Sequence, residues 1–269
     1  MMGTGRRSEE GSGRHCSGRK ARYAGPVVGV VFLIVLMVPA AAEILLRFLF
    51  PEVSERVFDR EPLAVLLFEH LALSLSAGLA ASIVGAVLGV VATRPRGRAF
   101  LPLIRDATAL AQTIPPAAVL ALAIPFLGFG TRPVLLALVL YSILPVLNNT
   151  VSGLEALPGP VVRAARGMGM TPAGIFFRIE LPLALPVIGS GVRTAMVINV
   201  GTATIGALAG AGGLGSPIVA GLVRNNPAWV FQGAAAAAVI ALLVDAALKA
   251  VETRLSRRGG ASAPPRAAA

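Results

Sequence analysis

The sequence contains little cysteine, little charge and few aromatic residues. Among 269 residues there are one cysteine, two histidines and two lysines, and 14% of the residues are charged and 5% aromatic. The single cysteine, Cys16, excludes an internal disulfide and a cysteine-based metal site. The histidines, His15 and His70, fall in a polar leader and at the edge of an apolar run, so we expect neither a metal site nor a catalytic dyad. A soluble domain carries about a quarter of its residues as charges, so this composition also excludes a soluble fold.

The sequence is instead rich in long apolar runs. Hydrophobic residues make up 55% of the chain, and the mean hydropathy is +0.78. A helix needs about 20 apolar residues to cross a membrane, and runs of that length recur. The sequence therefore predicts an all-α integral membrane protein, with a membrane domain over 26–250 and disordered tails at 1–25 and 251–269. About six transmembrane helices are expected, over 26–49, 63–92 (or 70–92), 107–127, 134–151, 187–209 and 229–250.

The net charge of +11 lies in the short segments between these runs. Placing both termini in the cytoplasm leaves eighteen Lys and Arg residues in the inner segments and four in the outer loops. This bias predicts a multi-pass membrane protein with both termini in the cytoplasm, because positive residues favour cytoplasmic loops and anionic lipid. The scattered arginines give no single basic surface, so we expect membrane lipid rather than nucleic acid as the partner of the charge.

The first predicted span has a competing interpretation. Its basic leader, apolar run and small residues are also typical of a signal peptide cleaved after Ala42. Apolar character resumes after that point and completes a full span, which favours an uncleaved helix. Glu43 and Arg47 lie one helical turn apart near the end of this span, and we expect them to pair.

The segment 158–186 separates the fourth and fifth predicted spans and contains several residues that start or stop helices. The letters "LPGP" stop the preceding span. A short helix is predicted over 161–168, followed by Gly169 as a left-handed C-terminal cap. Thr171 is expected to cap a second helix, and the Leu-Pro pair at 181–182 is expected to end it. Two capped helices on the cytoplasmic side favour a docking element for a partner over an inert connector, and a DNA-reading helix pair wedged between two spans is excluded.

The same segment resembles the cytoplasmic "EAA" loop of ATP-binding-cassette importer permeases. The resemblance extends over about residues 70–223 through the phrases "LAQTIPPAAVLALAIPFLGFG", "LYSILPVLNNT", "ARGMGMT", "ELPLALPVI" and "GVRTAMVINVGTATIGALAGAGGLG". These phrases together resemble the osmoprotectant subgroup, whose solutes are glycine betaine, carnitine and choline. In the loop pattern this chain has Arg163 where the family has glutamate. The candidate ATPase-coupling residues are Arg163, Ala164, Ala165, Gly167, Gly169, Ile179, Leu181 and Pro182.

The resemblance implies a type I importer core and a non-catalytic, pore-forming subunit without a cofactor, located in a bacterial plasma (inner) membrane. It also implies three partners: cytoplasmic ATPase subunits, a second permease that is identical or different, and an extracellular or periplasmic solute-binding protein. The sequence agrees, because it lacks the G-x-x-x-x-G-K-[ST] phosphate loop. Because the sequence has few aromatic residues that could form a cage around a quaternary ammonium, we expect the binding protein to recognise the solute. Alternatives are a permease for another small solute such as an amino acid, or a proton-coupled secondary transporter.

Polar residues inside apolar runs are candidates for the translocation path, because lipid penalises them. Hydrogen bonding between helices is the alternative for each of them. Two glycine patterns have simpler interpretations. The small-residue stripe from Gly78 to Gly89 is expected to pack against another helix of this chain. The letters "GAGGLG" at 210–215 lack the preceding strand and the following acid of a nucleotide-binding fingerprint, so we interpret them as an outer turn. The candidate path residues are Gln112, Thr113, Asn148, Asn149, Asn199, Thr202 and Thr204.

Overall fold

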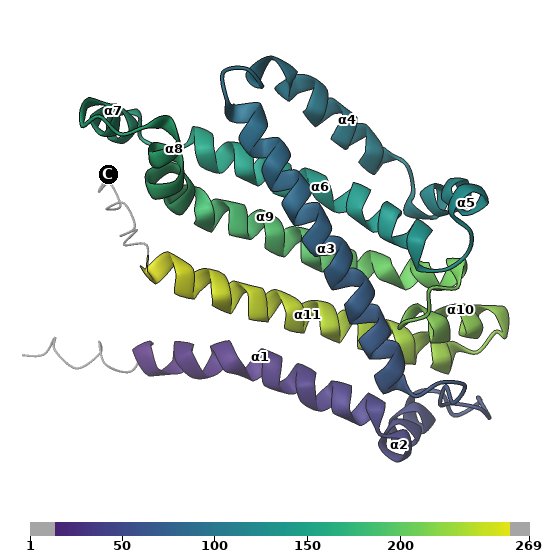
Figure 1. The fold of residues 1–269 in the computed structure, drawn as a ribbon. Helices are drawn as coiled ribbons and strands as arrows, with labels where there is room; N and C mark the ends of the chain where they lie inside the picture. Colours follow the sequence, from purple (N-terminus) through teal and green to yellow (C-terminus); the bar gives the residue numbers. More distant parts are fainter. Residues whose placement is uncertain (1–13, 259–269) are drawn as a thin grey trace, which may run out of the picture.

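The computed structural model of the chain describes residues 14–258 (Figure 1). Within them, four helices are long and apolar enough to cross a membrane, and a bent pair of helices makes a fifth if it is counted as one span. The predicted all-α membrane fold is confirmed. In chain order the elements are α1 (Arg14–Met37), α2 (Pro39–Leu49), α3 (Leu63–Thr93), η1 (Arg98–Phe100), α4 (Leu101–Thr113), α5 (Pro116–Leu127), α6 (Thr131–Glu155), α7 (Gly159–Gly167), α8 (Pro172–Ile175), η2 (Phe176–Glu180), α9 (Leu181–Thr202), η3 (Ala203–Ala209), α10 (Gly215–Val223) and α11 (Pro227–Arg258).

Three long helices, α3, α6 and α9, pack against one another at the centre, while α11 packs against α9 and α10 and α1 packs against α11. Small residues bring the backbones of α3 and α6 together. A Cβ added to Gly85 would lie 2.8 Å from Val146 Cβ, and one added to Gly89 would lie 2.6 Å from Thr150 Cβ. The small-residue stripe is therefore an intrachain packing surface, as predicted.

The helix ends gather at the two ends of this bundle. The start of α1, the end of α11 and the short helices α7 and α8 lie at one end, whereas α2, α5 and α10 lie at the other (Figure 1). Such an arrangement is what a chain with both termini on one side of a membrane requires. We call the end that carries α7 and α8 the coupling end, and the opposite end the far end.

Two of the predicted spans are not single helices. The first is bent by 97° between α1 and α2, and the third is divided into the shorter helices α4 and α5. Prolines explain both breaks, because the residue before a proline is held out of the helical region. Val38 precedes Pro39 with ψ 110°, and Ile114 precedes Pro115 with ψ 126°. The prediction of one continuous helix was therefore wrong for the first span.

Both predicted tails overlap helices. α1 begins at Arg14 and α11 continues to Arg258, so the expectation of disorder is wrong for 14–25 and 251–258. No proline lies in either overlap, and a helix that is already nucleated extends at little cost. Residues 1–13 and 259–269, which hold the rest of the predicted tails, lie outside the described residues.

Candidate coupling segment and translocation path

The turn between α7 and α8 has the geometry predicted from its glycine. Gly169 has φ +77°, and its N–H donates to Arg166 O at 3.0 Å, while the Met170 N–H donates to Ala165 O at 3.2 Å. These two bonds form a Schellman motif, which satisfies the last carbonyls of α7. Thr171 then caps α8, since its Oγ1 accepts from the Gly174 N–H at 3.1 Å. The turn is thus fixed by hydrogen bonds on both sides.

The predicted stop at Leu181-Pro182 is wrong. Leu181 is helical, with φ −62° and ψ −49°, and the chain runs without a break from α8 through the π-helix η2 into α9. In η2 the Leu181 N–H donates to Phe176 O, five residues back. This wider turn gives the ring of Pro182 room beside the preceding carbonyls, so the proline is accommodated without ending the helix. α8, η2 and α9 therefore form one continuous helix.

The helix pair α7 and α8, which we call the coupling segment, has one buried face and one open face. Ala165 of α7 and Ile175 of α8 are buried, and α7 packs against α8. Met168 and Phe177 are 74% and 66% exposed. Arg163 forms no ion pair with any residue in the described part of the chain. Of the other predicted coupling residues, Ile179 and Leu181 are half-buried and Ala164, Gly167 and Pro182 are exposed.

A contact that the sequence interpretation missed joins this segment to α3. The guanidinium of Arg94 lies 2.8 Å from Glu180 Oε2 and 4.8 Å from the ring centre of Phe176. Arg94 follows the last residue of α3, and the proline after it holds its backbone extended. The side chain of Glu180 is only 14% exposed, so this pair is shielded and ties α3 to the base of the coupling segment. A lone arginine in a basic loop gives no sequence signal for such a pairing.

Asn199 lies inside the helix packing rather than on an open surface. It is fully buried, and its amide lies 3.0 Å from the Ser142 hydroxyl. With the amide nitrogen directed at Leu138 O, the amide oxygen accepts from the Gly78 N–H at 2.9 Å. Asn199 therefore joins α3, α6 and α9, which is the interhelical alternative rather than pore lining in this conformation.

Two other candidate path residues also bond across helices. Gln112 donates to Tyr141 O at 2.6 Å and joins α4 to α6. Asn149 accepts from the Ser190 hydroxyl at 3.1 Å and joins α6 to α9. Thr113 is exposed, and Asn148, Thr202 and Thr204 are half-buried.

The charged residues inside or beside the spans form pairs that the sequence did not predict. Arg193 of α9 contacts Asp245 at 3.0 Å and Glu252 at 3.2 Å, both on α11. The two acids are seven residues apart, so they lie on one face of α11 two turns apart. The expected pairing of Glu43 with Arg47 is wrong, because Glu43 pairs with Arg56 of the following loop at 3.1 Å. That loop bends back over α2 and brings a better-placed arginine.

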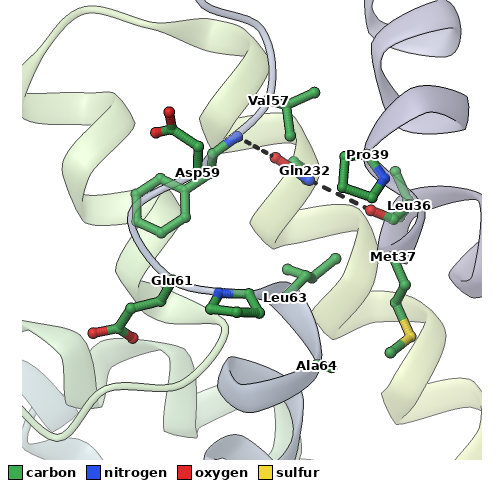
Figure 2. Close-up of a pocket in the computed structure, with 11 residues that line it drawn as sticks. Leu36, Met37, Pro39, Val57, Asp59, Glu61, Leu63, Ala64 and Gln232 are labelled. Atoms are coloured by element: carbon green, nitrogen blue, oxygen red, sulfur yellow. Dashed lines mark hydrogen bonds between the residues drawn. The ribbon is translucent and has the colours of Figure 1, made fainter.

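At the far end, the loop 50–62 is anchored to α11 beside a cavity of about 390 Å³. Gln232 is buried and bridges the loop to the α1–α2 bend (Figure 2). It accepts from the Phe58 N–H at 2.9 Å and donates to Leu36 O at 3.5 Å. Phe58 also packs edge-on against Trp229, with ring centres 5.4 Å apart. The loop is therefore a fixed part of the far end.

The structure is thus a bundle of apolar helices with an exposed, hydrogen-bonded helix pair at one end. The comparisons with known proteins identify the class. The sequence model of the family "Binding-protein-dependent transport system inner membrane component" matches residues 85–258. The chain belongs to this family of importer permeases.

Curated relatives cover most of the chain. The choline transport system permease protein OpuBB of Bacillus subtilis is 38% identical over 71% of this chain and 88% of its own length. The osmoprotectant import permease protein OsmY of Salmonella typhimurium is 39% identical over 70% and 79%. The carnitine transport permease protein OpuCD of Listeria monocytogenes is 40% identical over 70% and 84%.

A solved structure shows the same fold. The permease chain in a structure described as an inward-facing conformation of the MetNI methionine ABC transporter has a TM-score of 0.61 and 22% identity to this chain. It covers 73% of this chain and 95% of its own length. The predicted permease fold is thereby confirmed.

Proposed function

We propose that this chain is the pore-forming permease of an ATP-driven importer for a small quaternary-ammonium osmoprotectant of the choline, glycine betaine or carnitine type. The observation that carries the proposal is the coupling segment, an exposed helix pair fixed by the Schellman motif at Gly169 and continuous with α9. Such a segment transmits a push into the bundle instead of absorbing it. The chain supplies the pathway, and separate ATPase subunits supply the energy.

The partners follow from the two ends of the bundle. The ATPase subunits dock at the coupling end, where Met168 and Phe177 offer apolar contact and Arg163 a positive charge. This end faces the cytoplasm, because it carries the arginine-rich segments. A second permease completes the pathway, and a solute-binding protein delivers the solute to the far end. Arg163 replaces the glutamate of the family pattern, so its contact on the ATPase is with an acidic or carbonyl group.

The solute class rests on relatives, three of which are named for choline, osmoprotectant or carnitine transport and are 38–40% identical to this chain. The polar residues support a neutral path. Thr113, Asn148, Thr202 and Thr204 carry no charge and are exposed or half-buried. A path without an anionic trap lets a methylated cation or zwitterion leave as readily as it enters.

The test is reconstitution with the cognate ATPase and binding protein in vesicles. Choline, glycine betaine and carnitine should each be examined for stimulated ATP hydrolysis and for uptake, with methionine as a comparison solute. Uptake of a quaternary ammonium that requires ATP supports the proposal. Uptake of methionine instead would move the solute class to amino acids, and uptake driven by a proton gradient without the ATPase would refute an importer of this kind.

A further inference from the structure

The glycine-rich loop at 210–215 is held against α3 by unusually close contacts. Gly210, Gly212 and Gly213 all have φ between +74° and +75°. A Cβ on Gly212 would overlap Glu69 Oε2, and one on Gly213 would lie 3.2 Å from His70 Cβ. No side chain fits between this loop and α3, so the glycines serve close approach as well as backbone conformation.

Glu69 is the polar group at this contact. Its Oε2 accepts from the Gly213 N–H at 3.0 Å. No arginine, lysine or histidine in the described part of the chain forms an ion pair with this carboxylate. Glu69 therefore binds the loop through one backbone N–H, and this contact can be broken and remade without separating a pair of charges.

The neighbouring residue, His70, holds the end of α9. It is fully buried, and its Nε2 donates to Val200 O at 2.9 Å. Shortly after Val200 the α-helix changes to the seven-residue 3₁₀ helix η3. A 3₁₀ stretch of this length is uncommon because its hydrogen-bond geometry is poorer than that of an α-helix, so η3 can rearrange more readily than the α-helix before it. The Ala209 carbonyl at the end of η3 accepts from the Gly130 N–H at 2.6 Å, so the segment is held at both ends.

We propose that residues 203–215 form a gate at the far end of the pathway and that Glu69 is its latch. In this structure the latch is closed: the carboxylate holds Gly213, and η3 packs under the α5–α6 turn. Opening the far end requires the loop to leave Glu69 while His70 keeps the base of the hinge on α3. Glu69 is a positioning residue for transport. The proposal rests on the proposed function, because only a transport pathway needs such a gate.

Accessibility of a buried reporter at the gate tests the latch. Ala209 is fully buried beneath the loop, so Ala209→Cys in a Cys16→Ser chain should react slowly with an impermeant maleimide added from the far side. Glu69→Ala should raise the labelling rate about 10-fold, the population change expected for losing one hydrogen bond to a charged group. Glu69→Gln keeps an acceptor for Gly213 and should raise it less than about 3-fold.

A second reporter separates a latch from a general loosening of the fold. Ala228 is also fully buried at the far end, but it packs against α2 in a different cluster. Labelling of Ala228→Cys should stay unchanged by Glu69→Ala. If both reporters become reactive together, or if neither responds, the latch is refuted.

Two glycines of the loop provide a matched pair of variants. Gly210 and Gly212 have nearly equal φ, but a Cβ at Gly210 meets nothing within 4 Å. Gly212→Ala should therefore raise labelling well beyond Gly210→Ala, and this excess should vanish in a Glu69→Ala chain. Equal effects of the two glycine variants would contradict the proposal. The labelling needs neither solute nor ATP, so its outcome is independent of whether uptake of a quaternary ammonium is observed.

Discussion

Gly169 allows the docking role of the coupling segment to be measured separately from its folding. An L-residue in the left-handed region costs about 1–2 kcal/mol, and Gly169→Ala should cost this amount at the Schellman turn. A Cβ at this position meets no atom of the described chain within 4 Å. Gly169→Trp should therefore add no further cost in the isolated permease. Any greater effect of tryptophan has to come from a partner that occupies the space.

The assay is the dissociation constant of the cognate ATPase for the purified permease, measured without solute or binding protein. Gly169→Ala should weaken binding by about 5- to 30-fold at most, since the left-handed residue costs about 1–2 kcal/mol at the Schellman turn. Gly169→Trp should weaken it by at least about 100-fold, because a large side chain at a close backbone contact excludes the partner surface. Thermal stability of the two variants should be equal.

Two further variants serve as controls. Gly128 has φ +76° and also an open Cβ direction, but it lies at the far end after α5. Gly128→Trp should leave ATPase binding unchanged. Gly167 ends α7 with no atom near its Cβ, so Gly167→Ala tests a smaller intrusion without left-handed strain. Equal ATPase binding by Gly169→Trp and Gly169→Ala would refute the docking role of this turn.

Three other predictions follow from named contacts. Arg193→Ala removes the cation shared by Asp245 and Glu252. It should lower the free energy of unfolding by about 1–3 kcal/mol, between the values for exposed and buried ion pairs, and Arg193→Lys should lower it less. A decrease in melting temperature of under about 1 °C for Arg193→Ala would contradict this prediction. Arg94→Gln breaks the contact that joins α3 to the base of the coupling segment, so it should reduce uptake per ATP hydrolysed without weakening ATPase binding. An unchanged ratio of uptake to hydrolysis would show that this contact does not transmit motion. Thr171→Ala should cost about 1 kcal/mol of local stability at α8, measured by amide exchange, and unchanged exchange would argue against the cap.

The coupling turn was predictable because its signals are local. Gly169 and Thr171 act on backbone groups within a few residues, and both contacts form as expected. The end of that segment was not predictable, because Pro182 ends a regular helix but not a π-turn. Whether the chain widens into a π-turn depends on packing around η2, including Arg94 from the distant end of α3. The break at Pro39 was locally signalled as well, by the same pre-proline rule that explains the break at Pro115.

The candidate path shows a different limit. A polar residue in an apolar run has to be shielded from lipid. The sequence therefore identifies the residue as one that needs a polar neighbour. It does not say whether water or another helix provides the shielding. For Asn199 the partners are Ser142 and Gly78, which lie 57 and 121 positions away in the chain, so only the packed helices could show that it is buried. The same is true of Arg193, whose acids lie on α11.

The sequence by itself determined the membrane class, the helical fold, the two-helix coupling segment and the family, because hydropathy, caps and motif spacing act over short stretches of chain. Only the tertiary structure decided which charges pair, which polar side chains join helices, and that Glu69 holds the glycine loop. Those contacts join residues on different helices, and their strength depends on how closely the backbones approach. Small residues set that approach, and the partner of a small residue is fixed only when the helices have packed.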